Sequence, residues 1–136
     1  MAALARTKGN DHWRTPEWLY KALDLEFRFD LDPCPLDLRP PFDGLLLDWT
    51  GKRVFCNPPY SNILPWVEKG LRSAALTVFL LPGRADAKWF RMLRDEGAEI
   101  RFLGGRIHFA DITGKEHTKP PCGSLIAIVR RLDRRK

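Results

Sequence analysis

Residues 53–60 are Arg-Val-Phe-Cys-Asn-Pro-Pro-Tyr, and they indicate a strand that ends abruptly. Its first half, 53–56, is typical of a short strand with a buried centre. Two prolines follow almost at once, and because they lack backbone N–H groups they end the strand. Asn57 therefore stands where the strand ends. Open α/β sheets bind their ligands at the carboxyl ends of strands, so we expect the functional site here.

Outward from this strand, helical and extended patterns alternate. Thr15 and Pro16 precede apolar residues at helical spacing, which predicts a helix with Thr15 as N-cap, ending near Glu26. Period-two alternation predicts a first strand at 27–31, followed by a loop over 33–47. Further helices are predicted at 63–75 and 87–96, and further strands at 76–81, 99–103, 106–109 and 124–130, with a Gly104-Gly105 hairpin. This order indicates an α/β sheet with a mixed or antiparallel far edge.

Length and composition predict a single domain over 1–136, with flexible ends at 1–11 and 131–136. Hydrophobic residues make up 44% and charged residues 29%, a globular balance, and no apolar run approaches the ~20 residues of a membrane span. The amino terminus lacks a secretory pattern, so we expect a cytoplasmic protein. The three cysteines and three histidines have no spacing typical of a disulfide framework or a metal site.

Charge is distributed unevenly along the chain. Residues 1–68 carry 8 Lys and Arg against 10 Asp and Glu, whereas residues 69–136 carry 15 against 7. A basic half favours attraction to phosphate-rich polymers, although solubility alone also produces such an excess. Each candidate phosphate contact in this half could equally be an ordinary solvated side chain. The candidates are Arg84, Lys88, Arg91, Arg94, Arg101 and Arg106.

The stretch Asn57-Pro58-Pro59-Tyr60 offers a defined set of groups. Asn57 has a side-chain carbonyl, Pro58 has a backbone carbonyl, and Tyr60 has an aromatic face. The two prolines, Pro58 and Pro59, hold these groups rigidly. Together they suit a planar base with an exocyclic amine, which donates to both oxygens while its ring stacks on Tyr60. The alternative is an ordinary proline turn.

Seven blocks, in order from His12 to Phe109, carry a resemblance to a known family. The chain resembles the phage-type DNA N-6-adenine methyltransferases of the S-adenosylmethionine-dependent amino-methyltransferase class. The blocks are HWRTPEWLYKAL, FDLDPCP, GLLLDWTG, VFCNPPYSN, WVEKGL, LLPGRADAKWF and RFLGGRIHF. The resemblance implies a compact, abbreviated Rossmann-like methyltransferase sheet with helices on both faces and an antiparallel far edge. It also implies S-adenosyl-L-methionine as cofactor and double-stranded DNA as partner.

The resemblance implies cofactor contacts in three of these blocks. The first contains Trp13 and Thr15, where a helix N-terminus suits the methionine carboxylate of the cofactor. The second is Asp32-Pro33-Cys34, where Asp32 is the expected partner of the cofactor's ammonium group. The third contains Asp48 and Trp49, expected at the cofactor's adenine. Each of three residues also has a purely structural interpretation: Thr15 as a helix cap, Asp32 as the end of a strand, and Asp48 as part of a turn.

The implied reaction moves a methyl group from S-adenosylmethionine to the exocyclic amine of a flipped-out adenine, with catalytic residues Asn57, Pro58, Pro59 and Tyr60 and no metal. Because the chain has no room for a separate recognition domain, we expect short or relaxed recognition, with homo-oligomerisation left open. Two alternatives remain. One is methylation of the cytosine exocyclic amine. The other is a catalytically inactive DNA-binding relative, since the Gly-x-Gly that follows Asp-Pro in related enzymes is missing after Pro33.

Overall fold

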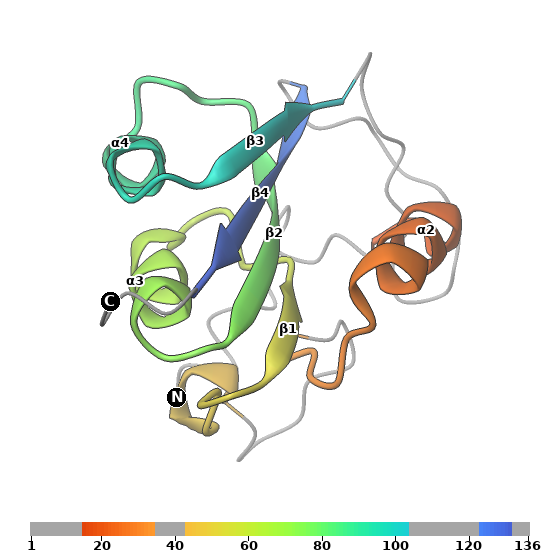
Figure 1. Ribbon diagram of the computed structural model, residues 1–136. Helices are drawn as coiled ribbons and strands as arrows, with labels where there is room; N and C mark the ends of the chain where they lie inside the picture. The colour runs from red at the N-terminus through yellow and green to blue at the C-terminus, as the bar shows by residue number, and fades with distance from the viewer. Residues whose placement is uncertain (1–14, 35–42, 104–122, 132–136) are drawn as a thin grey trace.

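A four-stranded open sheet forms the centre of the described protein (Figure 1). The computed structural model describes residues 15–34, 43–103 and 123–131. Within these ranges the strands are β1 (Arg53–Cys56), β2 (Leu76–Pro82), β3 (Glu99–Phe102) and β4 (Ser124–Arg130), in the spatial order β1-β2-β4-β3. Strands β1 and β2 are parallel, so their carboxyl ends meet at one edge of the sheet.

The antiparallel strand β4 lies inside the sheet. It pairs with β2 along its whole length and with β3 on its other side. Its side chains are buried from Ser124 to Val129, as expected for a strand covered on both faces. The predicted antiparallel component is therefore present, but it is inserted between β2 and β3, and β3 forms the edge.

Helices cover both faces of the sheet, as expected (Figure 1). Helix α2 (Glu17–Phe27) packs Leu19 and Leu23 against one face, together with Phe55 of β1. Helices α3 (Leu64–Arg72) and α4 (Lys88–Asp95) cover the other face through buried side chains that include Trp66 and Leu93. The α/β class and this layered arrangement agree with the prediction.

Two predictions near α2 are wrong in detail. Thr15 is not the N-cap: Pro16 holds that position, and no side chain caps the helix. The strand predicted at 27–31 is reduced to one bridge, between Leu31 and Val54. The helix continues through Phe27, and Arg28 then takes a left-handed conformation (φ 54°), which ends the helix and leaves little chain for a strand.

The predicted loop over 33–47 contains a 3₁₀ turn, η2 (Gly44–Leu46). Asp43 starts this turn by accepting a hydrogen bond from the Leu45 amide at 3.0 Å. Gly44 lies so close to the Pro33 carbonyl that a Cβ there would be 1.7 Å from its oxygen, which requires glycine. The turn thereby fixes the segment that leads into β1 against the segment that follows α2.

Some expectations fall beyond the described ranges. The hairpin with its strand at 106–109, the end 1–11 and residues 132–136 lie outside them. Arg131 is described, and it is anchored: its amide donates to the Ala75 carbonyl at 2.9 Å. No helix among the described residues is both long and apolar enough to cross a membrane. Those residues also include no cluster of three or more His, Cys, Asp or Glu side chains suited to hold a metal ion.

Candidate active site

Three segments meet where β1 ends. Asn57 directly follows the last residue of β1, and Thr15, two residues before α2, contacts it. The third segment runs beside β1, because the Leu31 carbonyl accepts a hydrogen bond from the Phe55 amide at 3.0 Å. Asp32 follows Leu31 and so lies alongside the carboxyl end of β1. Residues from the first, second and fourth resemblance blocks are thus gathered at one edge of the sheet.

The side chains of Asn57 and Thr15 are hydrogen-bonded. The Asn57 amide nitrogen Nδ2 donates to Thr15 Oγ1 at 3.0 Å, across 42 residues of sequence. Asn57 is 9% exposed and Thr15 is partly buried. Neither local sequence carries a signal of this contact, because the two residues are far apart in the chain. It joins the start of α2 to the end of β1.

The two prolines and the tyrosine that follow Asn57 form a compact turn. Pro58 and Pro59 are buried, and the Pro59 carbonyl accepts a hydrogen bond from the Asn62 amide at 3.1 Å. Tyr60 is partly buried and packs against the core cluster on the side of α3 and α4. The turn is therefore rigid, with Asn57 at its entrance.

The Asp32-Pro33-Cys34 segment turns sharply. Asp32 Oδ1 accepts a hydrogen bond from the Cys34 amide at 3.0 Å, and both Pro33 and Cys34 are buried. This side-chain turn fixes the backbone that directly follows Leu31. It holds a carboxylate near the start of α2, at the same edge as Asn57.

Asp48 and Trp49 lie elsewhere, just before the amino end of β1. Asp48 is exposed, and a hydrogen bond from the Thr50 amide at 2.9 Å lowers the pKa of its carboxyl group. Trp49 is 0% exposed, and its Nε1–H donates to the Gly44 carbonyl at 3.0 Å. Its ring also packs near Trp66, with centroids 6.3 Å apart. The indole thus has no exposed surface for a ligand, and β1 separates both residues from Asn57.

Three of the candidate phosphate contacts gather after the carboxyl end of β2. Arg84 lies in the connection from β2 to α4, Lys88 begins α4, and Arg91 follows one turn later. All three are exposed, and the Arg91 guanidinium donates to the Asp86 carbonyl at 2.8 Å. Because β1 and β2 are parallel, this basic group and Asn57 belong to the same edge of the sheet.

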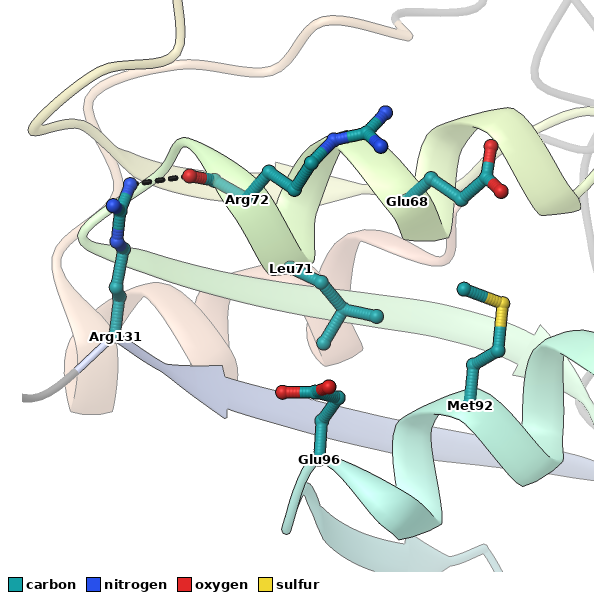
Figure 2. Close-up of a pocket in the computed structure, with 6 residues that line it drawn as sticks. All are labelled: Glu68, Leu71, Arg72, Met92, Glu96 and Arg131. Carbon is teal, nitrogen blue, oxygen red and sulfur yellow. Dashed lines mark hydrogen bonds between the residues drawn. The ribbon is translucent and has the colours of Figure 1, made fainter. Parts of the chain in front are cut away.

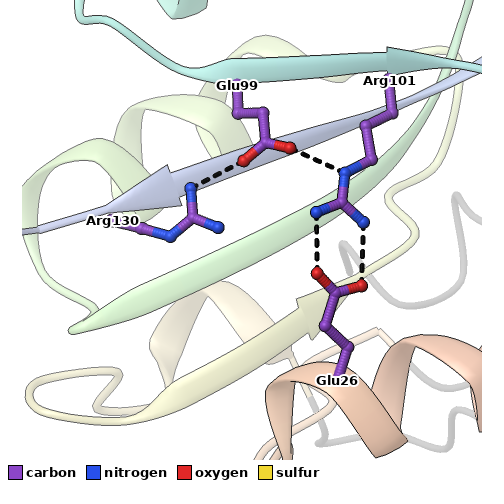
Figure 3. Close-up of polar contacts among 4 residues, drawn as sticks. All are labelled: Glu26, Glu99, Arg101 and Arg130. Carbon is purple, nitrogen blue, oxygen red and sulfur yellow. Dashed lines mark hydrogen bonds and ion pairs between the residues drawn. The ribbon is translucent and has the colours of Figure 1, made fainter.

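Two other arginines are paired with carboxylates. Arg94 contacts Asp95 at 3.2 Å. Arg101 binds Glu26 and Glu99, and these hydrogen bonds raise its pKa further above the ordinary range (Figure 3). Their charges are largely matched within the protein, so they are weaker candidates for DNA contact. Trp13 and Arg106 lie outside the described residues.

A groove of about 390 Å³ opens at another place in the described structure (Figure 2). It lies between α3, α4 and the end of β4, and both helices contribute their later turns to it. Its lining residues are Glu68, Leu71, Arg72, Met92, Glu96 and Arg131. Arg131, which follows the end of β4, also donates to the Arg72 carbonyl. This groove is therefore distinct from the site at the end of β1.

Comparisons with known proteins identify the family of this chain. The family described as DNA N-6-adenine-methyltransferase (Dam) matches residues 3–136. A protein named DNA N-6-adenine-methyltransferase, from Haemophilus phage HP1 (strain HP1c1), is 33% identical over 134 residues, which covers 85% of this chain and 78% of the phage protein. The chain belongs to the DNA N-6-adenine-methyltransferase family, as the resemblance in the sequence indicated.

Proposed function

We propose that this chain transfers a methyl group from S-adenosyl-L-methionine to the exocyclic amine of an adenine flipped out of double-stranded DNA. Family membership supports DNA adenine methylation in general. The observation that carries the specific mechanism is the Asn57 amide, anchored by Thr15 at the entrance of a rigid Pro-Pro-Tyr turn. We further propose that the protein acts in the cytoplasm of a bacterial or phage-infected cell.

The residues beside Asn57 fit the cofactor chemically. Asp32 offers a carboxylate for an ammonium group, and α2 begins at this edge, where the positive end of a helix suits a carboxylate. We keep Asp32, Pro33, Cys34 and Thr15 as proposed cofactor contacts. Trp49 has no accessible ring, and Asp48 lies before the opposite end of β1, so we leave both out. The cofactor's sulfonium supplies the methyl group when it is bound.

The chain's own contribution is to hold the target amine. The side-chain oxygen of Asn57 and the carbonyl of Pro58 accept its two hydrogens, while Tyr60 stacks on the base. An amine conjugated to a purine is a poor nucleophile, so positioning it in line with the methyl group and easing its pyramidalisation provide the acceleration. The new N–C bond would form as the bond between the methyl group and the sulfonium sulfur breaks, which leaves a neutral thioether, and the amine would release one proton to water. A base within a duplex does not reach this turn, so base flipping precedes the reaction.

Binding to DNA relies on the basic residues that follow β2. Arg84, Lys88 and Arg91 are exposed, and they follow the carboxyl end of β2, at the same edge of the sheet as Asn57. Phosphate contacts from such residues orient the duplex without reading its sequence. This arrangement favours short or relaxed sequence recognition.

The test uses purified protein, DNA and S-adenosylmethionine labelled in its methyl group. Asn57→Ala is expected to lower methyl transfer by about a hundredfold or more, because the amine loses an oriented acceptor. Calorimetry is expected to show nearly unchanged cofactor binding. Asn62→Ala is a matched control: Asn62 is exposed in the same turn and contributes its backbone amide to it. Full turnover by Asn57→Ala would overturn the proposal.

The products distinguish the alternatives. Chromatography of the digested DNA separates N6-methyladenine from N4-methylcytosine, and the proposal requires the former. Failure of the protein to bind S-adenosylmethionine in calorimetry would instead identify an inactive DNA-binding relative.

A further inference from the structure

We propose that Thr15 is a positioning residue that sets the orientation of the Asn57 amide for methyl transfer. This inference rests on the proposed function, and it assigns Thr15 a role beyond that of a cofactor contact. Thr15 does not touch the reacting atoms. It acts through the hydrogen bond of 3.0 Å that its Oγ1 accepts from Asn57 Nδ2.

The chemistry of an amide makes its orientation decisive. The oxygen and nitrogen of Asn57 have similar size, and rotation of the amide by 180° exchanges them. The Asn57 oxygen can accept a hydrogen bond from an exocyclic amine. The Asn57 nitrogen cannot, because both it and the amine are hydrogen-bond donors. An anchor on Nδ2 directs that nitrogen toward α2 and leaves the oxygen on the other corner of the amide. With its Oγ1 accepting from Nδ2, Thr15 holds the amide in the orientation that the proposed reaction needs.

The anchor itself is held firmly. Pro16 restricts the backbone of the residue before it to an extended conformation, which limits the movement of Thr15. The Pro16 carbonyl accepts hydrogen bonds from the Leu19 and Tyr20 amides, each at 3.1 Å. Leu19 is buried against the sheet, so the start of α2 has a fixed position relative to β1. Because Asn57 is 9% exposed, water has limited access to replace the threonine hydroxyl.

The experiment compares Thr15→Val with Thr15→Ser. Valine has nearly the same shape but no hydroxyl, whereas serine keeps the hydroxyl. We expect Thr15→Val to lower kcat about tenfold to a hundredfold, the effect of a misoriented reacting group. The start of α2 offers the cofactor backbone N–H groups, which valine at position 15 keeps, so KM for S-adenosylmethionine should stay within about threefold of the wild type. Thr15→Ser should restore most of kcat. Thr77→Val, the same substitution in the buried part of β2, is the matched control with unchanged kcat.

A second measurement does not depend on activity. In the wild type the Asn57 side-chain NH₂ resonances, assigned by their loss in Asn57→Ala, should show a hydrogen-bonded nitrogen. Thr15→Val should shift them, whereas Thr15→Ser should not. If valine prevents folding, Thr15→Ala provides the same comparison with a smaller side chain.

The outcomes separate the two proposals. Wild-type kcat in Thr15→Val, or a raised KM for the cofactor at unchanged kcat, would overturn the positioning role while the proposed function stands. Unshifted Asn57 amide resonances in Thr15→Val would also overturn it. A wild-type protein that transfers no methyl group would instead remove the proposed function, and the resonance comparison would still decide whether Thr15 holds the amide.

Discussion

Glu26 of α2 and Arg101 of β3 form a two-pronged ion pair across 75 residues of sequence (Figure 3). The two guanidinium nitrogens of Arg101 lie 2.8 and 2.7 Å from the carboxylate oxygens of Glu26. Glu99 accepts from Arg101 at 2.8 Å and from Arg130 at 2.9 Å. The group therefore ties the helix that begins beside Asn57 to the far strands of the sheet.

Glu26→Gln tests the contribution of this pair to stability through its pH dependence. The hydrogen bond from Arg101 holds the pKa of Glu26 below its ordinary value of 4.5. The stability it contributes is therefore present above pH 4.5 and is lost as the pH falls through the lowered pKa. Urea unfolding should show wild type more stable than the variant at pH 7, with the difference shrinking in the acid range. An equal difference at neutral and acid pH would contradict this.

Thr77→Val should stabilise the protein. The Thr77 hydroxyl is fully buried and has no hydrogen-bond partner among the described residues. Burying a hydroxyl without a partner costs about 1 to 3 kcal/mol, and valine fills the same space. We expect a gain of about 1 kcal/mol in the free energy of unfolding, measured in urea. A loss of stability would show that the hydroxyl does have a partner.

Gly70→Ala should destabilise the protein although alanine favours helices. A Cβ on Gly70 of α3 would lie 2.5 Å from Phe79 Cζ, and Phe79 is 0% exposed and belongs to the core cluster between α3, α4 and the sheet. The overpacking costs about 1 to 3 kcal/mol and outweighs a helix-propensity gain of at most about 1 kcal/mol. Thermal unfolding measures the net effect. A higher midpoint in Gly70→Ala would mean that α3 can shift away from β2.

Trp49→Phe should lower stability without weakening cofactor binding. Phenylalanine leaves the Gly44 carbonyl without its indole donor and vacates buried volume, at a cost of about 2 to 3 kcal/mol. Calorimetry with S-adenosylmethionine, at a temperature where the variant is folded, should give the wild-type affinity. Weaker cofactor binding with unchanged stability would return Trp49 to the cofactor site.

Arg84→Ala and Lys88→Ala should each reduce the salt dependence of DNA binding. Loss of one phosphate contact lowers the slope of log K against log salt concentration by about one. Arg94→Ala is the matched control, because Arg94 lies near the other end of α4 with its guanidinium on Asp95. Equal slopes in the wild type and both test variants would exclude this surface as the phosphate contact.

The central strands and the place of Asn57 were predictable from sequence. Residues 76–81 form an almost continuous apolar run, and 124–130 are similarly apolar, so they specify buried strands without knowledge of their neighbours. The Asn-Pro-Pro sequence ends β1 by backbone chemistry alone. These features depend on local pattern, which a single sequence contains.

Other features depend on contacts between distant segments. The alternation in 27–31 indicates a strand. The Asp24 side chain, however, accepts a hydrogen bond from the Phe29 amide at 2.8 Å, so the backbone just after α2 is bound to the helix and not to a strand. Trp49 has polar neighbours that suggest a surface turn, and its burial depends on a carbonyl supplied by η2. The partnership of Thr15 with Asn57 likewise has no signature in either local sequence.

The internal position of β4 affects how the chain folds. Strands β2 and β3 do not pair with each other, and both bind the strand that is synthesised last among those described. The β2–β4 pairing joins residues that are 42 to 54 positions apart, from Pro82 with Ser124 to Leu76 with Arg130. The chain therefore loses the entropy of closing a long loop before this pairing can stabilise it. During synthesis on the ribosome, the sheet therefore stays incomplete until residues 124–130 emerge. Until then the apolar strand β2 lacks its partner β4 and is prone to aggregation.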